Sequence, residues 1–279
     1  MKYLISIIIT LLTNDLFSQK VMYSELTDTN WDIYAISTED GIIKKITNDS
    51  LKDFQSDYSI RNGSIVFDSY RDENSRNIFT YNSKGELNQL THLKTRDGHP
   101  VWSPDGNKIA FQSSRTGNPE VFVMDSNGEN VKQLTFNEAF DGIPKWSPNG
   151  QLLAFNSNRN GYPNVFTLNQ ETKELKQITS NESYNFIQDW ISKTAVLIIT
   201  DVAEKRQMQI LEIKKGSTIR TIPTDGDVTY ARCNMNGQIV FTQKTNDGEV
   251  NVFLMNIENG NIRQLTDSSN KKRFPAFME

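Results

Sequence analysis

Two stretches of this 279-residue sequence decide its fold: DGHPVWSPDGNKIAFQSSRTGNPEVFVMDSNGENVKQLT at Asp97–Thr135 and DGIPKWSPNGQLLAFNSNRNGYPNVFTLNQETKELKQIT at Asp141–Thr179. They align without a gap at a spacing of 44 residues, and 18 of their 39 positions are identical. A period in the forties with several short apolar runs per repeat is typical of a β-propeller, in which each repeat forms one four-stranded blade. We therefore predict an all-β propeller.

Two positions that recur in phase give the number of blades. The pair [LI]-T closes the repeats at spacings of 44, 44, 44, 44 and 43 residues, with Pro replacing Thr once. Its six occurrences are Ile46-Thr47, Leu90-Thr91, Leu134-Thr135, Ile178-Thr179, Ile222-Pro223 and Leu265-Thr266. A mostly aromatic position keeps the same phase, at Tyr58, Trp102, Trp146, Trp190, Cys233 and Phe277. Both series predict six blades.

Each repeat divides into four strands. In the third blade we expect the innermost strand at Pro100–Trp102, the second at Lys108–Ser113, the third at Glu120–Met124 and the outer one at Val131–Leu134. The turn Ser103–Gly106 has Pro and Gly where β-turns favour them. The loops that enter the innermost strands and those between second and third strands then share one face of the ring, called here the top face.

The two ends of the chain complete one blade together. The first repeat, Val21–Thr47, lacks an innermost strand, and Phe274–Phe277 matches that missing strand. We predict that strand Phe274–Met278 pairs into the first blade and closes the ring. A closed ring has only short outer edges, which disfavours edge-to-edge association, so we expect a monomer.

The N-terminus resembles a secretory signal peptide. Lys2 precedes an apolar run, Leu4–Leu12, that is too short to span a bilayer. We predict a signal peptide at residues 1–19, a single propeller domain at residues 20–279, and export to the periplasm or the cell exterior. No later segment predicts membrane insertion.

Charge and cysteine content exclude some partners. The net charge is −4, and the Lys and Arg residues are scattered rather than gathered into a phosphate-binding footprint, so nucleic acid is not an expected partner. The single cysteine, Cys233, cannot form an internal disulfide.

The unit W-S-P-[DN]-G-x-x-[IL]-A-F-x-S-x-R-x-G-x-P-x-[VI]-[FY], at Trp102–Phe122 and Trp146–Phe166, resembles the TolB-like propeller repeat. Similar repeats occur in the propellers of prolyl oligopeptidase-type peptidases. We expect neither the α/β domain that precedes the propeller in TolB nor the hydrolase domain of the peptidases. The resemblance implies a six-bladed platform with a binding role and no named partner.

Charged residues recur on the predicted top face of three consecutive blades. Arg71, Arg115 and Arg159 share one position, and Asp53, Asp97 and Asp141 share another. Because the other three blades lack both residues, we predict that Asp and Arg pair through charge-assisted hydrogen bonds. The alternative is a half-ring of arginines that binds an anionic ligand.

Aromatic residues fall into two groups. Trp102, Trp146 and Trp190 keep one position per blade, which favours packing in the core over stacking on sugars. By contrast, four aromatic residues break the repeat in predicted top-face loops and are candidates for ligand contact: Trp31, Tyr70, Tyr162 and Tyr184.

Metal and cofactor signals are weak. His92 and His99 lie in one predicted loop without a carboxylate cluster, so we expect solvated loop residues, although His99 joins the candidate rim residues. Asp225 and Asp227 flank Gly226 and favour a plain turn over a calcium site. We expect no metal and no cofactor, and we assign no catalytic residue.

These observations favour an exported, non-enzymatic binding propeller that engages an envelope protein, a peptide or a glycan at its top face. A second hypothesis is an extracellular polysaccharide lyase or hydrolase with its site at the channel mouth. A third is one subunit of a system whose catalytic or translocation domain lies on another polypeptide.

Overall fold

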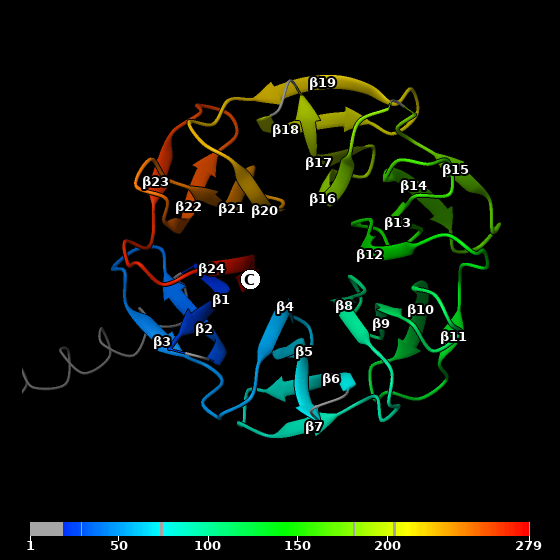
Figure 1. The fold of residues 1–279 in the computed structure, drawn as a ribbon, viewed down its shortest axis with the longest axis horizontal. Helices are drawn as coiled ribbons and strands as arrows, with labels where there is room; N and C mark the ends of the chain where they lie inside the picture. The colour runs from blue at the N-terminus through cyan, green and yellow to red at the C-terminus, as the bar shows by residue number, and fades with distance from the viewer. Residues whose placement is uncertain (1–18, 29, 73–74, 181, 203–204, 279) are drawn as a thin grey trace, which may run out of the picture.

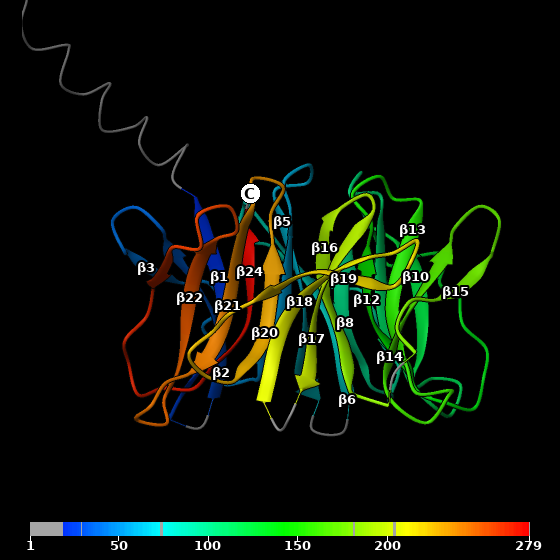
Figure 2. The ribbon, with the colours of Figure 1, turned by 90° about the horizontal axis from the view of Figure 1, so that it is seen from above.

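Each repeat folds into one antiparallel sheet, and six sheets surround a central axis (Figure 1). The computed structural model describes residues 19–28, 30–72, 75–180, 182–202 and 205–278. These residues form 24 strands in six four-stranded sheets and contain no helix. In side view the ring is shallow, and its strands run across its thickness (Figure 2). The predicted all-β, six-bladed propeller is confirmed.

The blades are given from the innermost strand outward. Blade 1 consists of β24 (Lys272–Met278), β1 (Lys20–Thr27), β2 (Asn30–Ser37) and β3 (Ile43–Lys45). Blade 2 consists of β4 (Asp53–Ser59), β5 (Ser64–Asp72), β6 (Ser75–Asn82) and β7 (Leu87–Gln89). Blade 3 consists of β8 (Asp97–Trp102), β9 (Lys108–Ser113), β10 (Glu120–Asp125) and β11 (Lys132–Gln133). Blade 4 consists of β12 (Asp141–Trp146), β13 (Leu152–Ser157), β14 (Asn164–Asn169) and β15 (Leu175–Gln177). Blade 5 consists of β16 (Asn185–Ser192), β17 (Ala195–Val202), β18 (Lys205–Glu212) and β19 (Ser217–Ile222). Blade 6 consists of β20 (Val228–Cys233), β21 (Gln238–Lys244), β22 (Val250–Asn256) and β23 (Ile262–Gln264).

Stacked aromatic pairs form the centre of most blades. The pairs join second and third strands at ring separations of 5.6 to 6.0 Å, and blade 5 has Ile199 opposite Met208 instead. They are Tyr23–Tyr34, Phe67–Phe79, Phe111–Phe122, Phe155–Phe166 and Phe241–Phe253. Facing aromatic rings on neighbouring strands stabilise a sheet beyond the area they bury.

The three inner-strand tryptophans seal the seams between blades. Trp102 packs with Val66 and Ile78 of blade 2, and Trp146 and Trp190 pack in the same way against the blades before them. All three are buried, so their predicted place in the core is confirmed.

The threonine of the [LI]-T pair has a direct structural use. In five blades its hydroxyl accepts a hydrogen bond, at 2.9 to 3.0 Å, from a backbone N–H of the third strand. The threonines are Thr47, Thr91, Thr135, Thr179 and Thr266. The bond fixes the end of the short outer strand, and Pro223 cannot supply it in blade 5.

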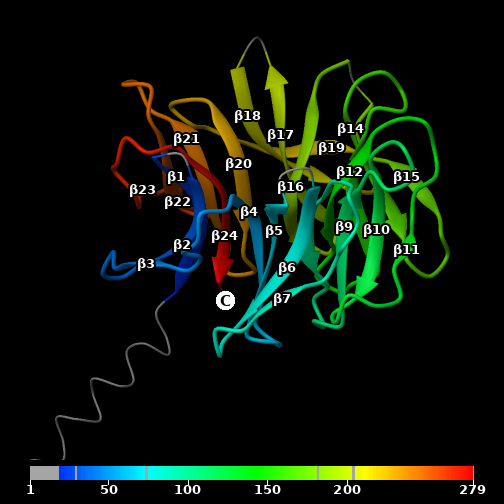
Figure 3. The same cartoon turned by 60° about the horizontal axis from the view of Figure 1, so that its bottom comes forward.

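The ring closes as predicted. β24 pairs antiparallel with β1, from Lys20 opposite Met278 to Glu25 opposite Lys272. Figure 3 shows β24, in red, beside the blue strand β1. The strand begins two residues before the predicted Phe274 and ends at Met278 as predicted.

Strand bounds differ slightly from the prediction elsewhere. β8 begins at Asp97, three residues before the predicted start, because backbone pairing with Ser113 precedes the apolar residues. The outer strand β11 is shorter than predicted. Residues 1–18 of the predicted signal peptide lie outside the described residues. In the part of the chain that is described, no helix is long and apolar enough to cross a membrane.

Candidate functional site

A cavity of about 750 Å³ lies at the centre of the ring, and its lining includes Gly248 and Lys271 of top-face loops. All six inner strands line it with the residue three positions before the aromatic position of the repeat. These residues are Gln55, His99, Ile143, Ile187, Tyr230 and Phe274. One position per blade therefore builds the wall, and its chemistry changes around the ring.

The backbone at this wall position is strained. Gln55, His99, Ile143 and Phe274 have φ angles of 50°, 52°, 57° and 53°. Left-handed backbone is uncommon outside glycine and especially unfavourable for a β-branched residue such as Ile143. Each inner strand also has a register shift against its neighbour. Bulges re-aim side chains, and strain of about 1–3 kcal/mol per residue gathers at binding sites.

A polar cluster covers the wall at blades 2 and 3. Arg76 Nε donates to the buried carboxylate of Asp68 at 2.5 Å, and Arg76 also donates to Gln55 Oε1. Burial raises the pKa of Asp68 to about 6. A Cβ at position 98 would lie 2.8 Å from Arg76 Cζ, so Gly98 leaves the room that the guanidinium occupies.

His99 is held as a neutral acceptor. Its backbone N–H donates to Gln55 Oε1 at 2.9 Å, and its Nε2 lies 3.0 Å from Gln55 Nε2. Because an amide nitrogen only donates, His99 Nε2 accepts, which assigns the ring proton to Nδ1. Burial, followed by the charges of Arg76 and Lys145, holds the pKa of His99 well below its usual range. His99 thus lies in β8 on the cavity wall, and its interpretation as a solvated loop residue was wrong.

A second ionic cluster crosses the channel beneath this wall. Arg232 of blade 6 forms salt bridges with Asp57 of blade 2 and, at 3.0 Å from its Nε, with Asp189 of blade 5. Asp57 also accepts the backbone N–H of Trp102 at 2.8 Å. Burial, and next the Arg232 charge, lower the pKa of Lys145 to about 7. Arg232 therefore links blade 6 to its neighbour, blade 5, and across the channel to blade 2, and it pairs with both carboxylates.

The cavity mouth is basic. Seven Lys and Arg residues line the cavity, and its described lining contains no Asp or Glu. Lys244, Lys271 and Arg273 are exposed, and no carboxylate among the described residues lies within ion-pair distance of them. Arg206 lies 3.4 Å from Asp201. Positive charge without a carboxylate partner among the described residues therefore gathers on blades 6 and 1.

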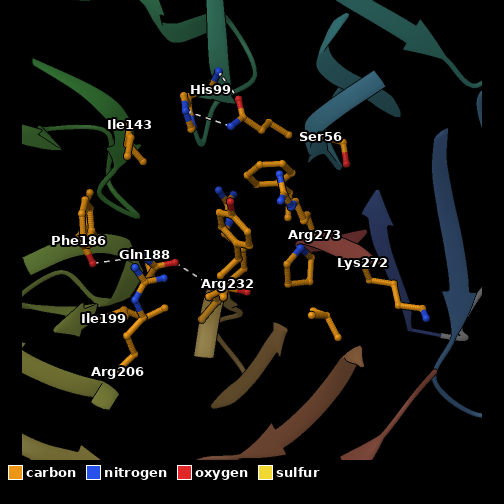
Figure 4. A pocket seen from close by; sticks show the side chains of 18 of the residues that line it. Ser56, His99, Ile143, Phe186, Gln188, Ile199, Arg206, Arg232, Lys272 and Arg273 are labelled. Carbon is orange, nitrogen blue, oxygen red and sulfur yellow. Dashed lines mark hydrogen bonds between the residues drawn. The ribbon is translucent and has the colours of Figure 1, made fainter. Parts of the chain in front are cut away.

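Lys272 also lines the cavity, but its ammonium is satisfied elsewhere. Its Nζ donates to the Ser268 carbonyl, the Ser268 hydroxyl and the Asn270 carbonyl at 2.5 to 2.7 Å. Figure 4 shows its side chain turned away from the centre. Lys272 is structural and fixes the chain before β24.

An aromatic path leads from the cavity to blade 1. Tyr230 packs on Phe274 at 4.2 Å between ring centroids, Phe274 meets Phe54 at 6.3 Å, and Phe54 meets Trp31 at 5.3 Å. The guanidinium of Arg273 lies 5.1 Å above the Trp31 ring. One face of Arg273 is therefore held by a cation–π contact while the residue lines the cavity.

The predicted rim aromatics separate into two places. Trp31 and Tyr70 lie in β2 and β5 rather than in loops, because these strands extend beyond their apolar runs, and both line a second hollow of about 550 Å³. Tyr162 and Tyr184 lie in top-face loops as predicted and meet edge to face at 6.0 Å. Tyr184 stacks on Phe186, which lines the cavity.

The predicted Asp–Arg pairs are confirmed in blades 2, 3 and 4. Arg71 lies 3.5 Å from Asp53, Arg115 lies 3.0 Å from Asp97, and Arg159 lies 2.6 Å from Asp141. All three carboxylates are buried. Their negative charge compensates the positive charge of the three arginines. A ligand role for these arginines stays a prediction.

The metal candidates show no cluster. Within the described ranges, no group of three or more His, Cys, Asp or Glu residues could hold a metal ion. His92 is exposed, and His99 Nε2 bonds Gln55. Asp225 lies in a bend beside Gly226.

Comparisons with known proteins identify the family of this propeller. The sequence profile of the TolB beta propeller domain matches residues 78–231, which is more than half of the chain. The chain belongs to the TolB β-propeller family. The resemblance predicted from the repeat is thereby confirmed. No curated protein matches the chain significantly in sequence.

Solved structures agree with membership of the TolB family. TolB from Acinetobacter baumannii superimposes with a TM-score of 0.80 at 19% identity, over 97% of this chain and 69% of that one. A protein described as TolB from Agrobacterium tumefaciens gives 0.73 at 14% identity, over 91% of each chain. An oligogalacturonate lyase in complex with manganese gives 0.62 at 12% identity, over 88% of this chain and 73% of that one. At such identities the likeness shows the fold alone.

Proposed function

We propose that this TolB-family chain is an exported, non-catalytic binding protein that holds a protein or peptide of the cell envelope at the cavity and rim of its top face. The observation that carries the proposal is the 750 Å³ cavity, which all six blades line. Pockets of this size take a small ligand or a short chain segment. Exposed Tyr162 and Tyr184 supply aromatic contacts on the rim, as partner-binding surfaces commonly do.

His99, Asp57 and Asp189 already have hydrogen-bond or ion-pair partners, which favours a binding role over catalysis. The imidazole of His99 is tied to Gln55, and the carboxylates of Asp57 and Asp189 are occupied by Arg232. A polysaccharide lyase or hydrolase needs a group free to take or give a proton at the reacting centre. The described wall therefore gives the second hypothesis no specific support.

Capture from an envelope fraction tests the binding role. The chain from Lys20 onward is immobilised, and retained partners are crosslinked and identified by mass spectrometry. We expect Tyr162→Ala to reduce capture several-fold. Leu175→Ala is the matched control, because Leu175 lies in the outer strand of the same blade and is similarly exposed, at 43% against 41% for Tyr162. Equal capture by both variants contradicts the proposed face, and capture of glycans alone contradicts the protein or peptide partner.

Export has a separate test. Expression of the full chain in a bacterium, followed by mass analysis of the periplasmic or secreted protein, should give a mature N-terminus near Gln19 or Lys20. Intact residues 1–19 on a cytoplasmic protein would contradict export and leave the binding face untouched.

A further inference from the structure

The two halves of the ring carry positive charge in different ways. In blades 2, 3 and 4 the top-face arginines are neutralised by buried aspartates of the same blade. In blades 6 and 1 the cations Lys244, Lys271 and Arg273 line the cavity with no carboxylate of the described residues in ion-pair distance. The chain as a whole has net charge −4, so this concentration is local and runs against the overall balance.

The wall beside these cations is apolar. Tyr230, Phe274, Phe186 and Ile187 line the same cavity and give one side of it an apolar surface. Charges of one sign next to low-dielectric walls focus their field into a cleft and raise the local concentration of counter-ions. The cavity therefore favours a ligand with two parts, one anionic and one apolar.

Arg273 is the residue best arranged to receive the anion. Its guanidinium lies 5.1 Å from the centre of the Trp31 ring, a cation–π contact that restricts the side chain, and Arg273 lines the cavity. The planar N–H edge of a guanidinium matches the two oxygens of a carboxylate. Lys271 precedes β24, two residues before Arg273, and adds a second positive charge at the mouth.

We propose that the cavity binds a carboxylate attached to an apolar group, with Arg273 contacting the carboxylate and Tyr230 and Phe274 packing against the apolar group. The C-terminal residue of a peptide and a free aromatic acid share this chemistry. The proposal rests on the binding role proposed above and names the ligand class of the same site.

Matched ligands that differ only in charge give a direct test. Isothermal titration calorimetry compares N-acetylphenylalanine with N-acetylphenylalanine amide, at low salt and pH 7. We expect the acid to bind at least tenfold more tightly than the amide, and its affinity to fall as salt screens the exposed cations. A tetrapeptide ending in phenylalanine, as free acid and as amide, shows which source fits better. Tighter binding of the peptide acid assigns a chain end, and equal binding of both acids assigns a free acid.

Variants locate the contact. Arg273→Gln should weaken binding of the acid at least tenfold and leave that of the amide unchanged. Lys215→Gln removes the same charge from an exposed lysine, 78% accessible, in the turn between β18 and β19 and should change neither. Thermal unfolding checks that both variants remain folded. Equal affinity for acid and amide, no binding at millimolar concentration, or an unchanged Arg273→Gln variant overturns the proposal.

Two further results separate this proposal from the binding role. Equal or tighter binding of digalacturonic acid, a hydrophilic carboxylate, overturns the apolar part of the ligand. Envelope partners that are still captured by Arg273→Gln but lost from Tyr162→Ala would sustain the binding role while removing the carboxylate site. Loss of capture from Arg273→Gln, together with tenfold weaker binding of the acid, supports both.

Discussion

Blades 2, 3 and 4 follow the repeat closely, whereas blades 5, 6 and 1 depart from it on the top face. In the first group an arginine and a buried aspartate recur at fixed positions and form salt bridges of 2.6 to 3.5 Å. In the second group both residues are missing, and basic side chains reach the central cavity instead. Both groups keep the stacked aromatic pairs of the core, in five of the six blades. The core therefore depends on the repeat, while the chemistry of the top face varies independently of it.

The largest effect should come from removing β24, the strand that completes blade 1 and so joins the irregular blades to the regular ones. Truncation after Asn270 removes β24, which supplies the inner strand of that blade and buries Ala276. The edge of β1 then loses its partner, and the ring opens. Since a domain is stable by only about 5–15 kcal/mol, we expect loss of the cooperative unfolding transition in calorimetry. Removal of Met278 and Glu279 alone is the control, and an unchanged melting temperature after the longer truncation would contradict closure by the tail.

The cross-ring salt bridges should give the next largest effect. Arg232→Met leaves the carboxylates of Asp57 and Asp189 without their cation, and breaking a buried pair in this way costs about 3–5 kcal/mol. Urea unfolding measures the change. Arg206→Met is the control, because Arg206 forms only a 3.4 Å contact with an exposed carboxylate. Equal stability of the two variants would show that Arg232 does not hold blades 2, 5 and 6 together.

Sequence reasoning found the blades because the repeat encodes local packing. Trp102 and Trp146 recur in phase because every seam between blades needs a large apolar side chain at that position. Even the closure by β24 was predictable, because the missing inner strand of one end is present at the other. The charged residues Lys145 and Arg232 precede the aromatic position, so a signal for charge on the channel side was also present.

The remaining site residues could not be found this way. The pairing of Arg232 with Asp57 joins residues 175 positions apart and depends on the closed ring. Lys244 and Arg273 follow no repeat, and only the assembled structure brings them to one cavity. For Arg115, sequence reasoning predicted the pairing with an aspartate that the structure shows, and kept a ligand contact only as the alternative.

A pair of variants contrasts the two groups directly. Arg115→Ala leaves Asp97 buried without its cation and removes the contacts of the guanidinium with the Phe111 and Phe122 rings, so we expect a loss of about 3 kcal/mol in urea unfolding. Arg273→Ala removes an exposed cation without a carboxylate partner among the described residues and should cost about 0.5 kcal/mol. The reverse order would contradict the division between structural and ligand-facing arginines.

The pH dependence of the free energy of unfolding tests whether the Lys145 amine is buried in the channel. The pKa of Lys145 is about 7 in the fold, because of burial and Arg232, and about 10.4 in an unfolded chain. Between these values the unfolded chain binds more protons, so the contribution of Lys145 to stability rises with pH. Asp189, Asp57 and Cys233 face the amine and oppose this shift.

We therefore expect the stability of the native chain, relative to Lys145→Met, to increase by about 1 kcal/mol per pH unit between pH 7.5 and 9. Urea unfolding at both pH values measures this change. Lys215→Met, at an exposed position, should keep the pH slope of the native chain. Parallel slopes for the native chain and Lys145→Met would contradict a desolvated amine.

The smallest expected effect concerns blade 2 and tests how its Asp–Arg pair depends on a neighbouring carboxylate. Arg71 is shared: its Nη1 lies 2.5 Å from Asp49, and its Nη2 lies 3.5 Å from Asp53. Burial raises the pKa of Asp53 to about 6, and the charge of Asp49 adds to the rise. Between about pH 4, where an unfolded aspartate titrates, and pH 6, the folded chain binds more protons, so this group lowers stability as the pH increases.

Asp49→Asn frees Arg71 for Asp53, and carbon-13 NMR titration should show the pKa of Asp53 falling, with a stability change below about 1 kcal/mol. Asp247→Asn, in an exposed loop of blade 6, is the control for loss of one surface charge. An unchanged pKa of Asp53 would contradict a contribution of Asp49 and the shared arginine to that pKa.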